Sequence, residues 1–325
     1  MANRRFYFTV LFFIAAITFL MCCEKGINNN NNNNDNPGGD DPKTPDTSLV
    51  EEITVHPQYE GYTLAWADNF SDSILNTSYW NIEVNGDGGG NNELQYYSRN
   101  NVSVETEPQS GRHCLVLTAR KENYNERTAT SGRINSKGKK VFEHGRIEAS
   151  IKLPRTANGL WPAFWMMGND YESVGWPHCG EIDILEMGHA NGIKAGTSDR
   201  YFNGACHWGL SWNGGAYPNY ANAFTSSYSL QDTFHLYTLI WDENYIRMYL
   251  DRDKYPSADP YYEMNISDRS GDNSPGNYFH KDFFILFNLA VGGNFPQIWD
   301  INGVTALSGG SAKMYVDFVR VYRGD

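Results

Sequence analysis

Apolar residues between residue 50 and the C-terminus recur in short runs, and no stretch keeps a 3.6-residue period long enough for a major helix. Alternate residues from 147 to 153 are apolar, which predicts a half-buried strand. Further strands are expected at residues 115–119, 236–241, 245–250, 283–291 and 314–322, with a hairpin turn at 242–244. Thirty-one Gly, 21 Tyr, 17 Phe and 9 Trp also suit an all-β fold with many turns. We therefore expect one antiparallel β-sandwich over residues 50–325.

The charge balance limits the class of ligand. The chain of 325 residues has 26 Lys+Arg against 38 Asp+Glu, a net charge of −12. Binding to a phosphate backbone needs clustered Lys and Arg, so nucleic acid is not an expected partner. Five Cys without a C-x-x-C pair predict neither a disulfide framework nor a zinc site. We expect Cys114, Cys179 and Cys206 to be free, inert thiols.

The first 49 residues predict export and attachment to a membrane. Two Arg precede sixteen uncharged residues, which is typical of a signal peptide over residues 1–22, with a transmembrane anchor as the alternative. The cysteine pair that follows resembles a bacterial lipobox and favours Cys23 as the lipidated residue. Residues 23–49, rich in Asn, Pro, Gly and Asp, cannot bury a core and predict a flexible linker. We expect an exported lipoprotein of the outer membrane or cell surface, with a periplasm-facing position as the alternative.

The most informative stretch carries three acids among Ile and Leu. In the sequence EIDILE at 181–186, a strand this apolar should be central, and an acid in it is costly unless hydrogen-bonded or functional. In a regular strand Glu181 and Asp183 share a face and Glu186 points the other way. One β-bulge between Asp183 and Glu186 would return all three carboxylates to one groove. The alternative, a solvent-facing acidic strand, conflicts with the apolar residues between the acids.

Such an arrangement suits the hydrolysis of glycosidic bonds with retention of configuration. That chemistry needs two carboxyl groups about 5–5.5 Å apart, one as nucleophile and one as acid/base. Asp183, lying between the two glutamates, can hydrogen-bond Glu181 and tune its ionisation. Crowding of like charges should also raise the proton affinity of Glu186, as a general acid requires.

Several further stretches carry a family resemblance. They are NNELQYY (91–97), SGRI (131–134), HGRIE (144–148), GLWPAFWMMG (159–168), GEIDILE (180–186), FNLAVGGNFP (287–296) and MYVDFVRVY (314–322). Together they resemble glycoside hydrolase family 16, specifically its laminarinase-like (endo-β-1,3-glucanase) branch, over residues 63–322. The resemblance implies an all-β jelly roll of two antiparallel sheets with a substrate cleft across the concave sheet. It also supports the bulge, since another branch of the family has one residue fewer in this motif.

The same resemblance assigns catalytic roles. Glu181 would be the nucleophile, Asp183 its helper and Glu186 the general acid/base. His207 matches a family histidine on the neighbouring strand, whereas read alone it suits a hydrogen-bonded core histidine. Catalysis by two carboxylates needs no cofactor.

Binding residues follow from the same comparison of motifs. Trp176, Trp161 and Trp165 would stack on sugar rings, because the C–H faces of sugars fit indole; core filling is the alternative. Arg133 and Asn92 would hydrogen-bond sugar on the non-reducing side, with a salt bridge as the alternative for Arg133. Relatives also bind a structural calcium ion through a carboxylate in the last strand, which places Asp317 there. Its alternative is hydrogen bonding to backbone N–H groups.

Three functions are compatible with these residues. The first is a lipid-anchored, monomeric, retaining endo-β-glycosidase that cuts β-1,3-glucan or mixed-linkage β-1,3/1,4-glucan. The second keeps the chemistry but cuts β-galactosidic bonds in algal galactans or in host mucin- and keratan-type glycans. The third is a non-catalytic surface glycan-binding protein, which should have lost the acid trio. Loops at a cleft rim select the linkage, and the long stretches 187–204 and 255–278 leave the substrate open.

Overall fold

The computed structural model describes residues 56–212 and 216–325. The predicted signal peptide, Cys23, the linker and the expected domain start at residue 50 lie outside the described residues. Within these two ranges no helix is long and apolar enough to cross a membrane. Residues 56–325 form one compact unit.

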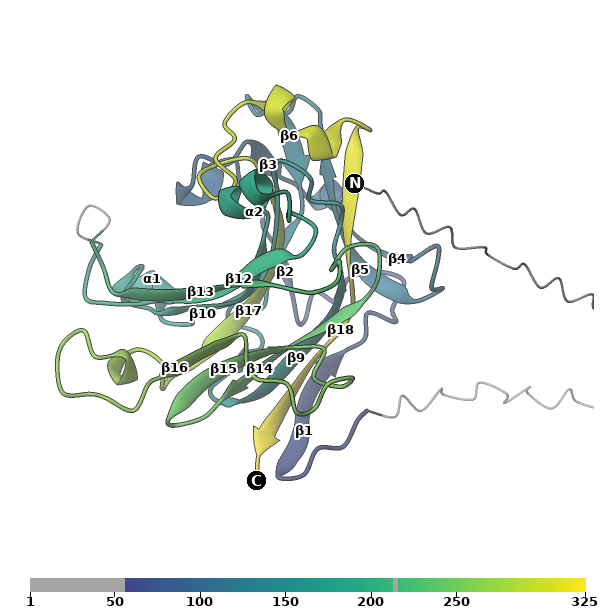
Figure 1. The fold of residues 1–325 in the computed structure, drawn as a ribbon. Coiled ribbons are helices and arrows are strands. Elements are labelled where there is room, and N and C mark those ends of the chain that lie inside the picture. Colours follow the sequence, from purple (N-terminus) through teal and green to yellow (C-terminus); the bar gives the residue numbers. More distant parts are fainter. Residues whose placement is uncertain (1–55, 213–215) are drawn as a thin grey trace, which may run out of the picture. The chain divides into compact units, whose positions relative to one another are not determined.

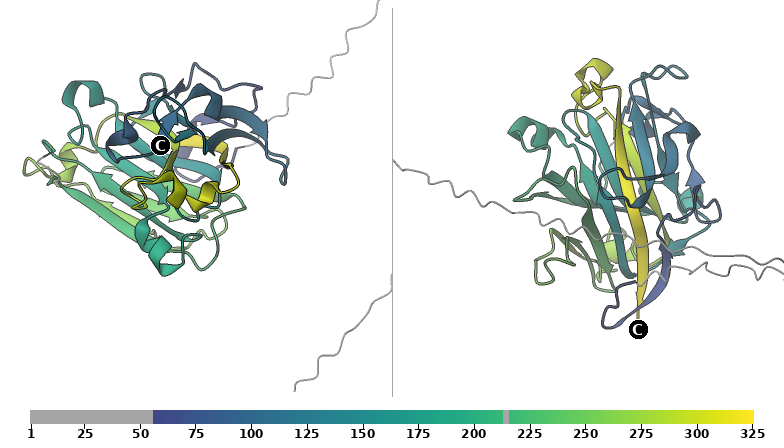
Figure 2. Two further views of the ribbon diagram at one scale, coloured as in Figure 1. Left: turned by 90° about the horizontal axis from the view of Figure 1, so that it is seen from above. Right: turned by 90° about the vertical axis from the view of Figure 1, so that its right-hand side faces the viewer.

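Two β-sheets, ten-stranded and eight-stranded in the described part of the chain, make up this unit (Figure 1). The ten-stranded sheet has the order β16-β15-β14-β9-β18-β5-β6-β3, with β1 paired to β18 and β4 to β5. Its strands are β1 (Tyr62–Asp68), β3 (Gln95–Tyr97), β4 (Val102–Thr106), β5 (His113–Arg120), β6 (Ala129–Ser131), β9 (Gly145–Lys152), β14 (His235–Trp241), β15 (Tyr245–Leu250), β16 (Tyr262–Asn265) and β18 (Ser311–Gly324). Figure 2 shows β18, in yellow, running along this sheet, and it pairs with β1.

The eight-stranded sheet has the order β13-β12-β11-β10-β17-β7-β2, with β8 paired to β17. Its strands are β2 (Asn81–Ile82), β7 (Arg133–Asn135), β8 (Val141–Phe142), β10 (Leu160–Gly168), β11 (Glu181–Met187), β12 (Tyr201–His207), β13 (Asn219–Thr225) and β17 (Phe283–Val291). All strand pairs in the two sheets are antiparallel except β3 with β6. The predicted antiparallel sandwich is therefore confirmed.

Helices are short in the part of the chain that the structure describes. They are α1 (Tyr171–Val174), α2 (Ala190–Ala195) and the 3-10 turns η1 (Gly88–Gly90), η2 (Arg99–Asn101), η3 (Pro275–Asn277), η4 (Ile301–Gly303) and η5 (Thr305–Leu307). The hairpin predicted around residues 242–244 is the β14–β15 pair. The other predicted strands correspond to β5, β17 and β18.

The hydrophobic core lies between the sheets because the inward-facing residues of both are apolar. Phe164 and Met166 of β10 and Phe287 of β17 belong to the same buried cluster as Leu239 and Trp241 of β14. The alternate residues of β10 point to the other face of the eight-stranded sheet, here called the outer face. A smaller apolar cluster lies on that face and includes Trp165 and Leu286. The outer face is thus partly apolar.

Strand β9 differs from the prediction of a half-buried strand. Its polar residues Arg146, Glu148 and Ser150 are buried as well as its apolar ones. Arg146 Nε donates to Glu148 Oε2 over 2.8 Å, and the Arg146 guanidinium carbon lies 3.7 Å from the Tyr59 ring centroid. Tyr59, which precedes β1, therefore covers the face that the alternation assigned to solvent. The buried charges are tolerated because they are paired.

Candidate active site

Strand β11 contains the predicted bulge. Glu181 and Asp183 lie opposite His207 and Ala205 of β12, but Glu186 lies opposite Asn203, with a register shift between Asp183 and Glu186. The pairing with β10 shifts at the same place. Ile182, Ile184 and Leu185 all belong to the core between the sheets. The bulge therefore directs the side chains of all three acids to the outer face.

One end of this strand holds a compact group of Glu181, Asp183 and His207. Trp176 Nε1 donates a hydrogen bond to Glu181 Oε2 over 2.9 Å. His207 Nε2 lies 3.3 Å from Asp183 Oδ2. One atom from each of Glu181, Asp183 and His207 lies within 4.8 Å of the others, close enough to hold a metal ion as a set. Only Glu181 of this set is one of the two carboxyl groups assigned to the predicted hydrolysis; the other, Glu186, lies toward the opposite end of β11, and that chemistry needs no metal.

At the other end, both oxygens of Glu186 accept a hydrogen bond. Trp161 Nε1 donates to Oε1 over 3.0 Å, and Asn203 Nδ2 donates to Oε2 over 2.9 Å. Sequence reasoning missed Asn203. The strand register could have revealed it, because the residue of β12 that lies opposite Glu186 after the bulge is Asn203.

The electrostatics of the three carboxyl groups follow from their burial and proximity. Burial, and then the charge of Asp183, raises the pKa of Glu181 to about 8 and also raises the pKa of Glu186. Burial raises the pKa of Asp183 as well. His207 and the Trp176 N–H act in the opposite direction on the pKa of Glu181. Such a group retains protons near neutral pH, which lets one carboxyl act as an acid beside another that is ionised.

The three candidate tryptophans lie in different surroundings. Trp176 is half-buried, and its ring meets Tyr217 edge-on at a centroid distance of 4.7 Å. Trp161 stacks on Phe295 at 4.5 Å, so one of its ring faces is covered. Trp165 is buried, and its Nε1 donates to Asn288 Oδ1 over 2.7 Å. Trp165 thus lies largely covered on the outer face, outside the core between the sheets, and its contact with sugar stays a prediction.

Sequence reasoning also missed Tyr217, which lies close to the acids. Its ring centroid is 5.7 Å from that of His207. Burial, and then the charges of Glu181, Asp183 and Glu186, raise the pKa of Tyr217. Only the tertiary fold reveals this, because Tyr217 lies outside every motif.

Arg133, at the start of β7, reaches the outer face beside Trp165, and Asn92 contacts the loop after β17. Arg133 Nε lies 3.0 Å from Glu83 Oε2, so the salt bridge considered as the alternative is present. Its guanidinium carbon is also 5.0 Å from the Trp165 ring centroid. Asn92 is exposed, and its Nδ2 donates to Asn294 Oδ1 over 3.1 Å. Their contact with sugar stays a prediction.

The predicted calcium site does not fit the residues found there. Asp317 of β18 forms an ion pair with Arg112, with 2.7 Å between Oδ2 and Nη1. A guanidinium in this position neutralises the carboxylate and competes with a cation. Asp317 is therefore neither a suitable calcium ligand nor a carboxylate bonded to backbone N–H groups, as the alternative expected.

The three other cysteines are free and buried, as predicted. Burial raises the pKa of both Cys114 and Cys179 to about 12, so thiolate is scarce at neutral pH.

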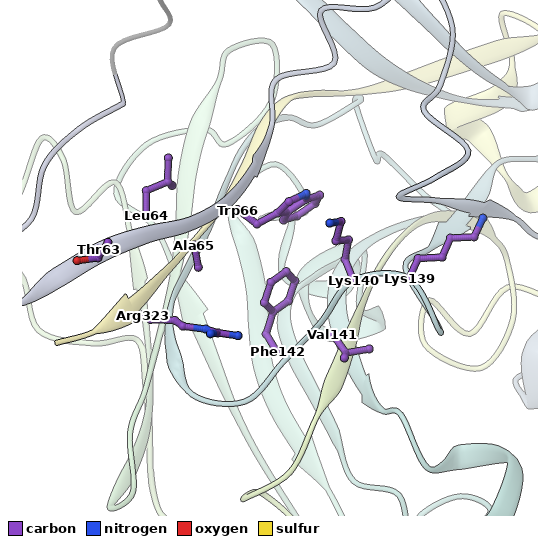
Figure 3. A pocket seen from close by; sticks show the side chains of 9 residues that line it. All are labelled: Thr63, Leu64, Ala65, Trp66, Lys139, Lys140, Val141, Phe142 and Arg323. Carbon is purple, nitrogen blue, oxygen red and sulfur yellow. The ribbon is translucent and has the colours of Figure 1, made fainter.

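A cavity of about 510 Å³ lies away from the acids (Figure 3). Its lining comes from β1, β8, β18 and the turn before β8, and consists of Thr63, Leu64, Ala65, Trp66, Lys139, Lys140, Val141, Phe142 and Arg323. It contains no acid, so it is not part of the candidate active site.

Comparison with known proteins decides the family. Residues 91–265 match the model of Glycosyl hydrolases family 16. The chain belongs to this family. Glucan endo-1,3-beta-glucosidase A1 of Niallia circulans is 32% identical over 306 residues, covering 86% of this chain and 41% of that protein. Beta-glucanase of Rhodothermus marinus is 32% identical over 266 residues, covering 81% of this chain and 85% of that one.

A solved family 16 structure is also similar. It is a Bacteroides ovatus mixed linkage glucan PUL GH16 protein in complex with G4G4G3G product, 41% identical, with a TM-score of 0.68. The match covers 79% of this chain and 99% of that one. By contrast, the chain spans 34% of the length of the clotting factor G alpha subunit of Tachypleus tridentatus and 41% of that of the Niallia circulans protein.

Proposed function

We propose that this chain is a retaining endo-β-glucanase that hydrolyses mixed-linkage β-1,3/1,4-glucan. The observation that carries the proposal is the bulged strand β11, which leaves Glu181, Asp183 and Glu186 on one face with each glutamate held by an indole N–H. The 41% identity to the Bacteroides ovatus protein favours mixed-linkage glucan. The similarity to the Niallia circulans endo-1,3-β-glucosidase supports β-1,3-glucan as a second candidate substrate.

The mechanism takes two steps. In the first, a Glu181 carboxylate oxygen bonds to the anomeric carbon, the glycosidic C–O bond breaks, and Glu186 gives its proton to the leaving oxygen. In the second, Glu186 takes a proton from water, the water oxygen bonds to the anomeric carbon, and the ester bond to Glu181 breaks. Two inversions restore the β-configuration.

The neighbours of the acids have distinct parts in these steps. The N–H groups of Trp161 and Asn203 stabilise the Glu186 carboxylate that forms after proton donation. The N–H of Trp176 stabilises Glu181 as a carboxylate before attack. His207 Nε2 lies 3.3 Å from Asp183 Oδ2, and this contact orients the Asp183 carboxyl beside Glu181.

A polysaccharide panel with sizing of the products tests the proposal. We expect barley β-glucan and laminarin to be cut to oligosaccharides from within the chain, and barley β-glucan to be cut faster. Cleavage of agar or mucin glycans with the glucans left intact would instead support the β-galactosidase alternative. A protein that binds glucan without cutting any member of the panel would be a glycan-binding protein.

We also propose that the enzyme is exported and attached by a lipid on Cys23 to the outer membrane. The basic start, the short apolar stretch and the cysteine pair support this. Cys23→Ala should move the protein from the membrane fraction to the soluble fraction, with Cys22→Ala as the matched control. Unchanged membrane association of Cys23→Ala would contradict lipidation at that residue.

A further inference from the structure

The segment that follows β17 is a short, closed loop over residues 292–299. Gly293 N donates to Ile298 O over 2.7 Å, and Ile298 N donates to Gly293 O over 3.2 Å. Asn294 N donates to Asn91 O over 2.8 Å, which fixes the loop to a second segment. At Gly293, with a φ of +93°, an added Cβ would lie 2.7 Å from Asn91 O. The loop is therefore held rigidly on β17.

This loop adjoins the catalytic acid. Its Phe295 stacks on Trp161 with an interplanar angle of 8°, and Trp161 donates to Glu186. One aromatic stack thus connects the loop to the acid/base.

Trp299, at the end of the loop, has its indole N–H hydrogen-bonded while its ring is largely exposed to solvent. Its side chain is 58% exposed. Its Nε1 donates to Asn294 Oδ1 over 3.1 Å, and the same oxygen accepts a hydrogen bond from Asn92 Nδ2 over 3.1 Å. The polar edge of the indole therefore has its partner, and much of the apolar ring faces solvent. An exposed tryptophan held in one orientation is suited to stack on the C–H face of a sugar.

We infer that Trp299 forms a distal subsite that stacks on a glucosyl residue of a long β-glucan chain. Asn294 positions the indole, and the exposed Asn92 amide lies beside it as a polar contact for the same sugar. The inference rests on the proposed function, since the ligand is the glucan substrate itself. Such a subsite selects long chains, because a short substrate that fills only the sites next to Glu181 and Glu186 does not reach it.

Trp299→Ala tests this subsite, with Tyr255→Ala as the matched control. Tyr255 is also an exposed aromatic residue, at 52%, but it lies in the loop between β15 and β16, which belong to the ten-stranded sheet, whereas the acids lie on the eight-stranded sheet. We expect Trp299→Ala to raise KM for barley β-glucan roughly tenfold, the size of a stacking contact worth about 1.4 kcal/mol. Its kcat/KM on an aryl β-glucobioside should stay at the wild-type value. Tyr255→Ala should match the wild type on both substrates.

Binding without turnover provides a second readout. In a Glu181→Gln background, affinity electrophoresis in gels that contain barley β-glucan should show Trp299→Ala less retarded than the parent. Trp299→Phe should restore part of the retardation, and Asn294→Ala should give an intermediate loss. Equal retardation and equal KM for Trp299→Ala and Tyr255→Ala would overturn the subsite. Failure of the wild type to cut any β-glucan would instead overturn the proposed function.

Discussion

Removing the Asn203 side chain should move the alkaline limb of the pH–rate profile to higher pH. Asn203 is buried, and its amide donates to Glu186 Oε2 over 2.9 Å. A hydrogen bond to a charged group contributes about 1.5–3 kcal/mol. Because one pKa unit corresponds to about 1.36 kcal/mol, losing this donor should raise the pKa of Glu186 by roughly 1–2 units. The sign follows from the donor, which stabilises the ionised carboxylate more than the neutral carboxyl; without it, Oε2 keeps a proton more readily.

The assay is kcat/KM for barley β-glucan against pH, for the wild type and Asn203→Ala. The alkaline limb reports loss of the proton from the acid, and it belongs to the coupled group of carboxyls rather than to one residue. Asn222→Ala is the matched control, because Asn222 lies on the neighbouring strand β13 and donates to Tyr261 O. An alkaline limb that stays in place, or moves to lower pH, in Asn203→Ala would refute this account of Glu186.

Three further predictions concern the acids. Glu181→Gln should be inactive on polysaccharide and on activated aryl glycosides, whereas Glu186→Gln should still form the glycosyl-enzyme from the latter. Azide should rescue Glu186→Ala and give a β-glycosyl azide; a β-glycosyl azide from Glu181→Ala together with an α-glycosyl azide from Glu186→Ala would reverse the two roles. The first-formed product should be the β-anomer by early-time NMR; an α-anomer would exclude the double displacement. Folding raises the pKa of Glu181 from 4.5 to about 8, so the folded chain holds more protons across that window and its unfolding free energy falls as pH rises. Asp183→Asn, which removes one charge, should therefore raise Tm by about 2–5 °C at pH 8 and by less at pH 5; an equal gain at both pH values would contradict the electrostatic cause.

Residues close together in the chain were the predictable part of this protein. The spacing of Glu181, Asp183 and Glu186, together with the cost of burying acids, predicted both the bulge and the shared face. Short apolar runs bounded by turn residues also located β14, β15 and β17, because such runs are a local property of the chain. The free cysteines also agree with the prediction made from the number of Cys and the lack of a C-x-x-C pair.

What covers each face could not be predicted in this way. The pattern of β9 assigned Arg146 and Glu148 to solvent, but Tyr59, 89 residues before Glu148, lies over them. Asp317 meets Arg112 from a segment 205 residues away, which removes the expected ion site. Each outcome depends on a contact partner from a distant segment.

The sequence by itself determined that this chain folds as an antiparallel sandwich and carries three acids on one bulged strand, because alternation, bulges and the cost of buried charge act over a few residues. Only the tertiary structure decided which groups hold those acids. Asn203 reaches Glu186 through the register of β12 on β11, and Phe295 reaches Trp161 from the loop after β17. Such pairings are set by how whole strands align in a sheet, and local periodicity contains no information about that alignment.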